Sequence, residues 1–321
     1  MKKYLHDFCR DFVATEKSIS RAEPLQMPYV YPICAQMFVE NGKHPDSKKL
    51  KQSDALFGKK AGLFFELSGT SALMLISHLS MAENPEERLE EIDAGKKILR
   101  EFFPASEALF LASLVLTRGT TEDQWRELAE KAHGIYEVIK KEHALLTSGG
   151  DIIFSILMAK TGKDRDLLDR ANAFQEYLEK ALPGTEPVTL SRVLALESEG
   201  SVEEISERFL TLYHKLAEKG CAYGKRYQLP MLGIASMMPN DIDEIVNDIC
   251  EVDKYLARQD LYRGLLHWYS KTVRLMHATM IVTGAYAKER RKQEGTDDHY
   301  VKAELLAMNI SLWNLFYVLF I

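Results

Sequence analysis

The segment KEHALLTSGGDII, residues 141–153, holds the side chains with the clearest potential for chemistry. His143, Ser148 and Asp151 could serve as the base, the nucleophile and the orienting carboxylate of a hydrolase, and Thr147 adds a second hydroxyl. A structural interpretation needs less: His143 complements the negative end of one helix, and Ser148 or Asp151 caps the next. Because the segment contains no GxSxG turn, we favour the structural interpretation.

A second group of candidate residues is acidic. Residues 239–255, PNDIDEIVNDICEVDKY, would place Asp241, Glu244 and Asp248 on one face of a helix. Three carboxylates on one face could hold Mg²⁺. The DDxxD motif of prenyl-transferring enzymes is absent, however, and the helix dipole alone favours acidic residues in a first turn. We therefore expect neither a metal nor another cofactor here.

The histidines and glycines give no sign of a metal or nucleotide site. None of the nine histidines has the spacing of HExxH, and the sequence contains no glycine-rich phosphate loop. His78 and His277 lie within apolar segments, so we predict that both are hydrogen-bonded core residues.

A third group of candidates would bind a partner. GCAYGKRYQLP, residues 220–230, contributes Tyr223, Arg226 and Tyr227 between two predicted helices. Tyrosine and arginine are favoured as anchors at protein interfaces. Tyrosines at such a corner also commonly pack against the neighbouring helix, so both roles remain open.

These candidates must be positioned by helices. One segment shows the pattern of a complete helix, from its N-cap to the glycine that ends it. In GSVEEISERFLTLYHKLAEKG, residues 200–220, Ser201 is the expected N-cap and Glu204 completes a capping box. An apolar stripe runs from Ile205 to Leu216 at helical spacing. Gly220 stands where a glycine ends a helix.

The same layout recurs along the chain. Each polar helix follows a short apolar helix, and the turns between them fall at Asn84, Gly119, Gly162, Gly200 and Asn240, at intervals of 35, 43, 38 and 40 residues. At the last turn Asn240 is followed by Asp243. Helix pairs at a period of about 40 residues indicate a helical array. We predict an all-α fold of about five stacked helical hairpins, a degenerate α-solenoid-like array with the apolar helices inside; a globular α-bundle is the alternative.

The ends of the chain frame the predicted array. Residues 1–58 are expected to form two N-terminal helices and a lysine-rich connection, of which residues 42–60 carry six lysines. Residues 59–261 form the array, and residues 262–321 form two long helices that cap it, joined by a charged turn at 287–299. We expect the three parts to make one continuous structural unit.

Composition favours a cytoplasmic protein. The chain has 321 residues, 46% of them hydrophobic and 27% charged, with a net charge of −6, so we expect no nucleic-acid partner. The four cysteines are scattered and are predicted to be reduced, mostly buried thiols. The N-terminus has no apolar signal region; instead Leu5, Phe8, Cys9, Phe12 and Val13 predict an amphipathic helix.

The C-terminal run from Leu305 to Ile321 raises the question of a membrane. It has seventeen residues, fewer than a membrane span needs, and Asn309, Ser311 and Asn314 interrupt it. We predict a helix largely surrounded by protein, with a tail anchor or an interfacial helix as the alternative.

Two further segments carry a family resemblance. YEVIKKEHALLTSGGDIIFSILMAKTGKD, residues 136–164, and LAEKGCAYGKRYQLPMLGIASMM, residues 216–238, resemble a family of uncharacterised bacterial proteins catalogued as domain of unknown function 4003. The early segment YVYPICAQMFVENGK resembles the N-terminal segment of that family. This resemblance covers most of the chain and implies no activity and no catalytic residues.

Stacked helix pairs typically offer extended surfaces to a protein or peptide. The expected function is therefore a non-catalytic interaction module, with His143, Thr147, Ser148, Asp151, Tyr223, Arg226 and Tyr227 as the candidate surface. The alternative is an enzyme or small-molecule binder with a pocket between helices near His143–Asp151.

Overall fold

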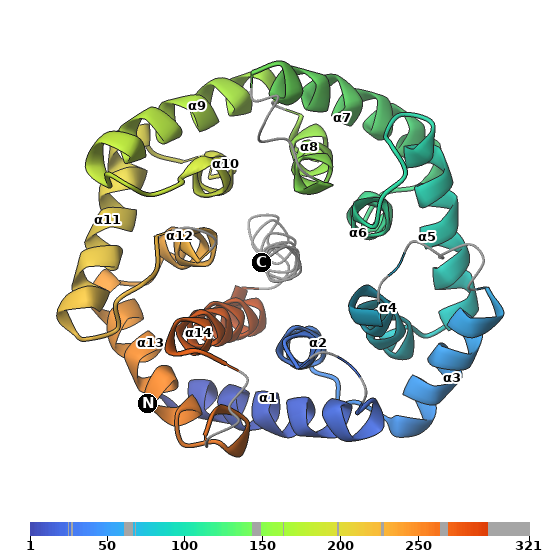
Figure 1. Cartoon of the computed structure of the whole chain (residues 1–321), viewed down its shortest axis with the longest axis horizontal. Helices are drawn as coiled ribbons and strands as arrows, with labels where there is room; N and C mark the ends of the chain where they lie inside the picture. The colour runs from blue at the N-terminus through green and yellow to red at the C-terminus, as the bar shows by residue number, and fades with distance from the viewer. Residues whose placement is uncertain are drawn as a thin grey trace. The chain divides into compact units, whose positions relative to one another are not determined.

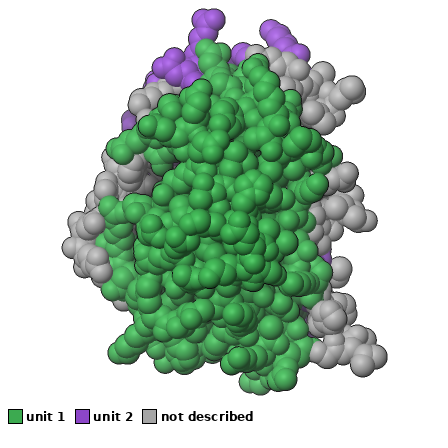
Figure 2. All heavy atoms as spheres, turned by 90° about the vertical axis from the view of Figure 1, so that its left-hand side faces the viewer, with its two compact units in different colours: residues 1–21, 31–44, 168–321 green, residues 22–30, 45–167 purple. Residues whose placement is uncertain are grey.

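The computed structural model describes residues 1–24, 26, 28–60, 67, 69–142, 149–162, 164–197, 199–225, 228–263 and 269–294. These residues form two compact units, coloured separately in Figure 2. Unit 1 comprises residues 1–21, 31–44 and 168–321, and unit 2 comprises residues 22–30 and 45–167. The described residues form α-helices, turns and a single 3₁₀ turn, with no strand among them, so the prediction of an all-α fold is confirmed.

Unit 2 is a stack of helical hairpins. In Figure 1, α4, α6 and α8 form one layer and α3, α5 and α7 form another. Neighbours pack within each layer, α6 on α8 and α5 on α7, as well as between the layers. The bounds of these helices are α3 Ser47–Lys59, α4 Gly69–Met81, α5 Pro85–Arg100, α6 Ala108–Thr117, α7 Glu122–Glu142 and α8 Gly149–Thr161.

Unit 1 repeats this arrangement. Here α10 packs on α12, α12 on α14 and α11 on α13. The long helix α9 begins in unit 2 and continues in unit 1. The bounds are α1 Lys3–Ala22, α2 Val30–Glu40, α9 Asp164–Ala181, α10 Val188–Ala195, α11 Val202–Glu218, α12 Leu229–Met237, α13 Ile242–Leu256, the 3₁₀ turn Asp260–Tyr262 and α14 Lys271–Glu294.

The predicted division into apolar and polar helices is confirmed. All ten residues of α6 are buried, as are eight of the nine in α12. The second helix of each hairpin buries only a stripe; in α11 that stripe includes Ile205, Phe209, Leu212 and Leu216. A hairpin alone would leave its apolar helix in water, so each one is stabilised by its neighbours in the stack.

The predicted residues that begin and end the helices are confirmed at most turns. The capping box of Ser201 and Glu204 is complete, and Asn84 accepts a hydrogen bond from the Glu87 N–H. Gly220 has a φ of +75°, and the N–H groups of Gly220 and Cys221 donate to carbonyls in the last turn of α11. These two hydrogen bonds form a Schellman motif, in which glycine is favoured at the position of Gly220.

Three predictions about element limits need correction. The lysine-rich connection contains helix α3, because Asp46 caps it and Leu50 and Ser53 are buried along one stripe. Helix α13 begins one residue after the predicted turn position Asn240: its N-cap is Asp241, whose side chain accepts from the Asp243 and Glu244 N–H groups. Helix α14 continues to Glu294, through most of the predicted charged turn at 287–299.

Cations bind the carboxyl ends of two buried helices, α6 and α12. Lys160 Nζ donates to the carbonyls of Val115, in the last turn of α6, and of Arg118, the residue that follows the helix, at 2.8 and 2.6 Å. Arg208 donates to three carbonyls at the end of α12, those of Ser236, Met238 and Asn240. A cation there satisfies carbonyls that lack a helical partner and complements the helix dipole.

The N-terminal prediction is also confirmed, since Leu5, Phe8, Cys9, Phe12 and Val13 are all buried in α1. Among the described residues no helix is long and apolar enough to cross a membrane. The predicted C-terminal helix, residues 305–321, lies outside the described residues, and the predicted domain limits remain predictions.

Candidate functional site

The structure describes one of the four candidates in the 143–151 segment. Asp151 lies in the first turn of α8, where an acidic residue complements the helix dipole, and its side chain is fully buried. Its carbonyl accepts a hydrogen bond of 2.7 Å from Ser155 Oγ. His143, Thr147 and Ser148 lie outside the described residues, so the structural interpretation of this segment remains a prediction and the catalytic one its alternative.

The proposed surface role of Tyr223 needs correction. Tyr223 is buried, and its hydroxyl donates a 2.8 Å hydrogen bond to Thr279 Oγ1 of α14. Burial raises the pKa of this phenol above its usual value. Tyr223 is therefore part of the core of unit 1. Arg226 and Tyr227 lie outside the described residues.

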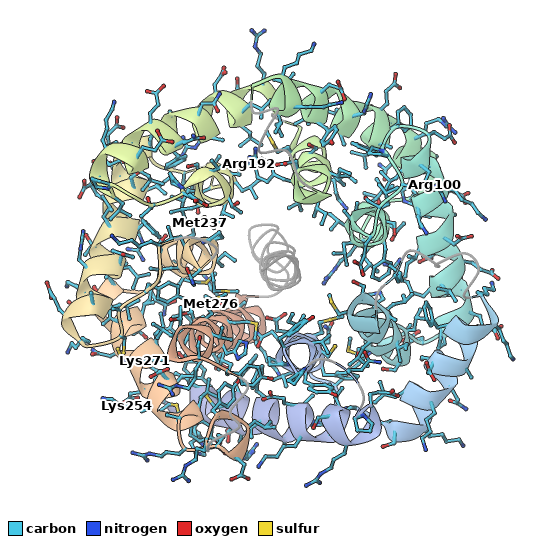
Figure 3. All side chains as sticks on the ribbon, viewed as in Figure 1. Arg100, Arg192, Met237, Lys254, Lys271 and Met276 are labelled. Atoms are coloured by element: carbon cyan, nitrogen blue, oxygen red, sulfur yellow. The ribbon has the colours of Figure 1, made fainter. Side chains whose placement is uncertain are left out.

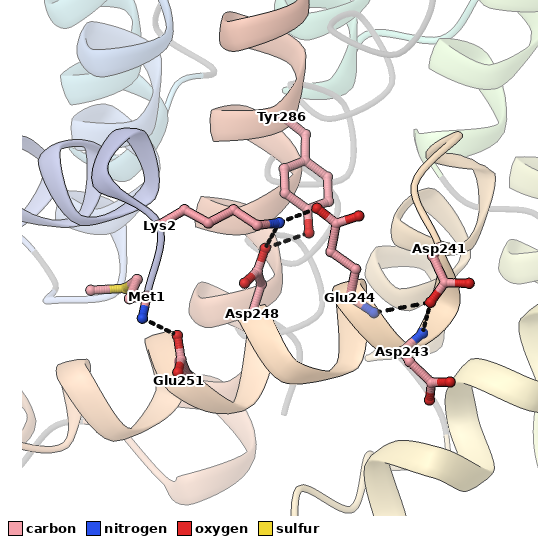
Figure 4. A network of polar contacts seen from close by, with 8 residues as sticks. All are labelled: Met1, Lys2, Asp241, Asp243, Glu244, Asp248, Glu251 and Tyr286. Atoms are coloured by element: carbon pink, nitrogen blue, oxygen red, sulfur yellow. Dashed lines mark hydrogen bonds and ion pairs between the residues drawn. The ribbon is translucent and has the colours of Figure 1, made fainter.

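The acidic face of α13 holds an ammonium group. Lys2 Nζ lies between Glu244 and Asp248, which are one helical turn apart, and its distance to Asp248 Oδ2 is 2.9 Å (Figure 4). The third predicted member of this face, Asp241, points instead to the N-terminal N–H groups of α13 as the cap. The α-amino group of Met1 pairs with Glu251 at 2.6 Å. Two of the three carboxylates considered for Mg²⁺, Glu244 and Asp248, thus bind an amine of this chain.

Two tyrosines complete the surroundings of the Lys2 ammonium group. Its nitrogen lies 5.5 Å from the ring centre of Tyr286 and 6.0 Å from that of Tyr4, within the range of cation–π attraction. The Tyr286 hydroxyl donates to Asp248 Oδ2 at 2.6 Å. Burial lowers the pKa of Lys2, but the hydrogen bonds to Glu244 and Asp248 outweigh it and raise that pKa above its usual value. Lys2 is therefore charged throughout the physiological pH range.

A separate cluster of ionisable side chains is enclosed between α1 and α14. Tyr269 Oη donates to Glu16 Oε1 at 3.1 Å, and Tyr262 Oη is hydrogen-bonded to His277 Nδ1 at 2.8 Å. Burial raises the pKa of Glu16 to about 8 and lowers the pKa of His277 to about 3. Both side chains are consequently neutral near pH 7. The hydrogen bond of buried His277 matches its predicted role as a core residue.

The second histidine in an apolar segment also has a hydrogen-bond partner, because His78 Nε2 accepts from Arg88 Nε at 3.1 Å. Across the described part of the chain, no three histidine, cysteine, aspartate or glutamate side chains are grouped so as to hold a metal ion.

An aromatic patch lies where the connection after α5 meets α7 in unit 2. Its members are Phe102, Phe103, His133, Tyr136 and Lys140. The rings of His133 and Tyr136 both meet Phe103 edge-on, with centroids 5.5 Å apart in each case. Lys140 Nζ lies 6.0 Å from the centre of the Tyr136 ring. Phe103 is buried, whereas Phe102, His133 and Tyr136 are half-buried.

The signal for this patch in the sequence is weak. His133, Tyr136 and Lys140 follow one another at helical spacing, but Phe102 and Phe103 come from a different element about thirty residues earlier. Only the packing of α5 against α7 brings the two groups together. The patch offers half-exposed rings next to a cation, which suits binding to another molecule better than covalent chemistry.

The fold and these sites define an all-α protein of stacked helical hairpins. A family model described as a protein of unknown function (DUF4003) matches residues 21–311, and the chain belongs to this family. The resemblance seen in the sequence is thereby confirmed. Neither the curated proteins nor the solved structures contain a match to the chain.

Proposed function

We propose that the chain is a non-catalytic module that binds a protein or peptide through the polar layer of its helical array. The observation that carries this proposal is the aromatic patch of unit 2. Phe102, His133 and Tyr136 keep part of their rings accessible although Phe103 beneath them is fully packed. Rigid aromatic side chains bury a large area at a small cost in conformational entropy, so they are favoured anchors at interfaces.

The charges around the patch indicate which kind of peptide would bind there. Lys140 lies over the Tyr136 ring and pairs with Glu137 at 3.3 Å, and the two side chains are 54% and 39% exposed. An exposed ion pair contributes little stability, so a partner could exchange it at small cost. The patch therefore suits a peptide with an apolar side chain for the rings and a carboxylate for Lys140.

The test is affinity capture from a lysate of the source organism with four forms of the immobilised protein. These are the wild type, Tyr136→Ala, Phe102→Ala and the control Tyr213→Ala. Tyr213 is a half-buried tyrosine on the polar layer of unit 1 that stacks on Phe209 at 6.2 Å, so it matches Tyr136 in type and exposure. Circular dichroism verifies that every variant is folded.

We expect the wild type and Tyr213→Ala to retain the same protein and both patch variants to lose it. One interface hot spot typically contributes about 2 kcal/mol or more, so the loss should exceed roughly tenfold. Retention of that protein by the folded patch variants, or no reproducible capture by the wild type, would refute the proposal.

A further inference from the structure

The ammonium group of Lys2 lies in a site that three helices of unit 1 build together. Glu244 and Asp248 of α13 accept hydrogen bonds from it, with Asp248 Oδ2 at 2.9 Å. The rings of Tyr286 on α14 and Tyr4 on α1 lie 5.5 and 6.0 Å from its nitrogen. We call Tyr4, Glu244, Asp248 and Tyr286 the ammonium cage.

The cage has the chemistry of a site for an organic ammonium ion. Each carboxylate accepts from one N–H of the ammonium group, and the faces of tyrosine rings attract a cation. Mg²⁺ prefers an octahedral shell of oxygen ligands, which ring faces do not supply. The cage therefore favours a charged amine with an aliphatic chain over a metal ion.

The buried carboxylate of the cage requires a cation. Asp248 is 5% exposed, whereas the Glu244 side chain is 35% exposed. If the Lys2 side chain leaves, Asp248 keeps the 2.6 Å hydrogen bond from the Tyr286 hydroxyl but loses its ion pair with Lys2. Breaking a buried ion pair by removing one partner is strongly destabilising. Another cation that enters the cage would thus be bound in place of Lys2.

Lys2 occupies the cage with its side chain alone. Its carbonyl accepts a 2.9 Å hydrogen bond from the His6 N–H, and Leu5 in the same turn is fully buried. These contacts hold the first turn of α1 in place. The Lys2 side chain is 38% exposed, so it can leave the cage by rotation about its own bonds while α1 stays folded.

Two other lysines of unit 1 provide a contrast. Lys254 of α13 is exposed at the surface of unit 1 (Figure 3). Lys17, on the same helix as Lys2, pairs at 3.0 Å with Asp260, whose side chain is 85% exposed. An exposed pair of this kind contributes little stability and leaves no buried charge when it opens. Lys17 is therefore the natural control for Lys2.

We propose that the ammonium cage is a binding site for a small primary alkylammonium ion, and that Lys2 occupies this site as an intramolecular competitor. A free amine brings the same ammonium group and the same aliphatic chain, so it restores each contact that the Lys2 side chain gives up. A short tether gives Lys2 an effective concentration on the order of millimolar. An amine of equal intrinsic affinity thus displaces half of Lys2 in the millimolar range. This site does not depend on the aromatic patch of unit 2.

The first experiment measures the access of Lys2 to an acylating reagent in the full-length wild-type protein. The protein is treated briefly with an activated ester of acetic acid at increasing concentrations of n-butylamine, and acetylation of each lysine is quantified by mass spectrometry. Lys17 in the same sample is the reference, so consumption of the reagent by the amine cancels in the ratio of Lys2 to Lys17.

Without amine, Lys2 should react at least about tenfold more slowly than Lys17, because its raised pKa leaves less of the reactive neutral amine. We expect the ratio to rise severalfold with n-butylamine and to reach a plateau. Sodium chloride at the same ionic strength and n-butanol at the same concentration should leave the ratio nearly unchanged.

The second experiment removes the competitor. Lys2→Ala should melt at a lower temperature than the wild type, and n-butylamine at about ten times its dissociation constant should raise that temperature by roughly 2–4 °C. The matched variant Lys17→Ala, which loses only an exposed pair, should not respond to the amine. Circular dichroism verifies that both variants are folded.

Two results would overturn the proposal. One is a ratio of Lys2 to Lys17 acetylation that stays constant with n-butylamine, because Lys2 would then be a permanent structural contact. The other is an equal effect of the amine on Lys2→Ala and Lys17→Ala, which would mean unspecific action on the protein. The acetylation measurement uses the wild type, so it does not depend on the folding of a variant.

Discussion

At the scale of single residues, Glu16 is the most unusual side chain of the described structure. It is completely buried on α1, and one carboxylate oxygen accepts a hydrogen bond from Tyr269. Burial raises its pKa to about 8, against the weaker lowering effects of that hydrogen bond and of Lys17. A carboxyl that is neutral in the folded protein and charged in the unfolded chain makes stability depend on pH.

The direction of this dependence follows from proton binding. Between the pKa of about 4.5 in the unfolded chain and about 8 in the folded state, the folded protein binds more protons. Its free energy of unfolding therefore falls as the pH rises through this interval, in total by about 5 kcal/mol. His277 acts in the opposite direction at lower pH, because its pKa falls from 6.5 to about 3 on folding, so stability is lost as the pH falls below 6.5.

The variant Glu16→Gln should remove the dependence above pH 6.5, since the amide keeps the shape and can still accept from Tyr269 but does not ionise. We expect urea unfolding of the variant to show nearly constant stability from pH 6.5 to 8, where His277 is neutral in both states, while the wild type weakens. Equal slopes in the two proteins would show that Glu16 is charged in the folded state.

At the scale of elements, two glycines inside helices differ in the space around their missing Cβ atoms. Gly233 lies in α12, where a Cβ would approach Leu190 Cδ1 of α10 to 2.6 Å. Leu190 is itself fully buried, so it has little room to move. Gly134 lies in the polar helix α7, and nothing stands within 4 Å of its missing Cβ. The glycine of α12 therefore allows α10 and α12 to pack closely, whereas the glycine of α7 has no such role.

The substitutions Gly233→Ala and Gly134→Ala should consequently act in opposite directions. Alanine favours a helix by about 1 kcal/mol over glycine, and forcing a methyl into a packed interface costs about 1–3 kcal/mol. We expect Gly134→Ala to raise the free energy of unfolding by about 0.5–1 kcal/mol. Gly233→Ala should lower it by about 1 kcal/mol or more. Stabilisation by both changes would contradict the close packing of α10 on α12.

At the scale of the whole molecule, each unit is a two-layer stack whose stability is distributed unevenly. The apolar helices α6 and α12 are almost entirely buried, while α3 buries only Leu50 and Ser53 among its thirteen residues. Helices with few buried contacts open more readily than the core around them.

Hydrogen exchange of the backbone amides should follow this order. We expect the amides of α6 and α12 to exchange most slowly, those of α7 and α11 at intermediate rates, and those of α3 fastest. Peptide-resolved mass spectrometry of the intact chain measures this directly. If α3 were as protected as α6, the stability of unit 2 would not be concentrated in its apolar layer.

Local features of this protein could be predicted from the sequence because they depend on residues a few positions apart. The capping box of Ser201 and Glu204, the glycine stop at Gly220 and the alternation of apolar and polar helices are all confirmed. Helix α3 was missed because its lysines hide a narrow apolar stripe. A helix that buries only two residues gives a weak periodic signal.

The candidate site depended on contacts between distant parts of the chain. The sequence raised a metal ion for the acidic face of α13 only to disfavour it, and it gave no sign of the actual occupant, Lys2, more than 240 positions earlier. Tyrosine is a residue type favoured at interfaces, but Tyr223 packs on Thr279 in the core. Hydrogen bonds along a helix form between neighbours in the chain, so the sequence determines helices, caps and turns. The partners of a buried charge or an aromatic ring come from whichever helices pack together, and that choice belongs to the tertiary structure.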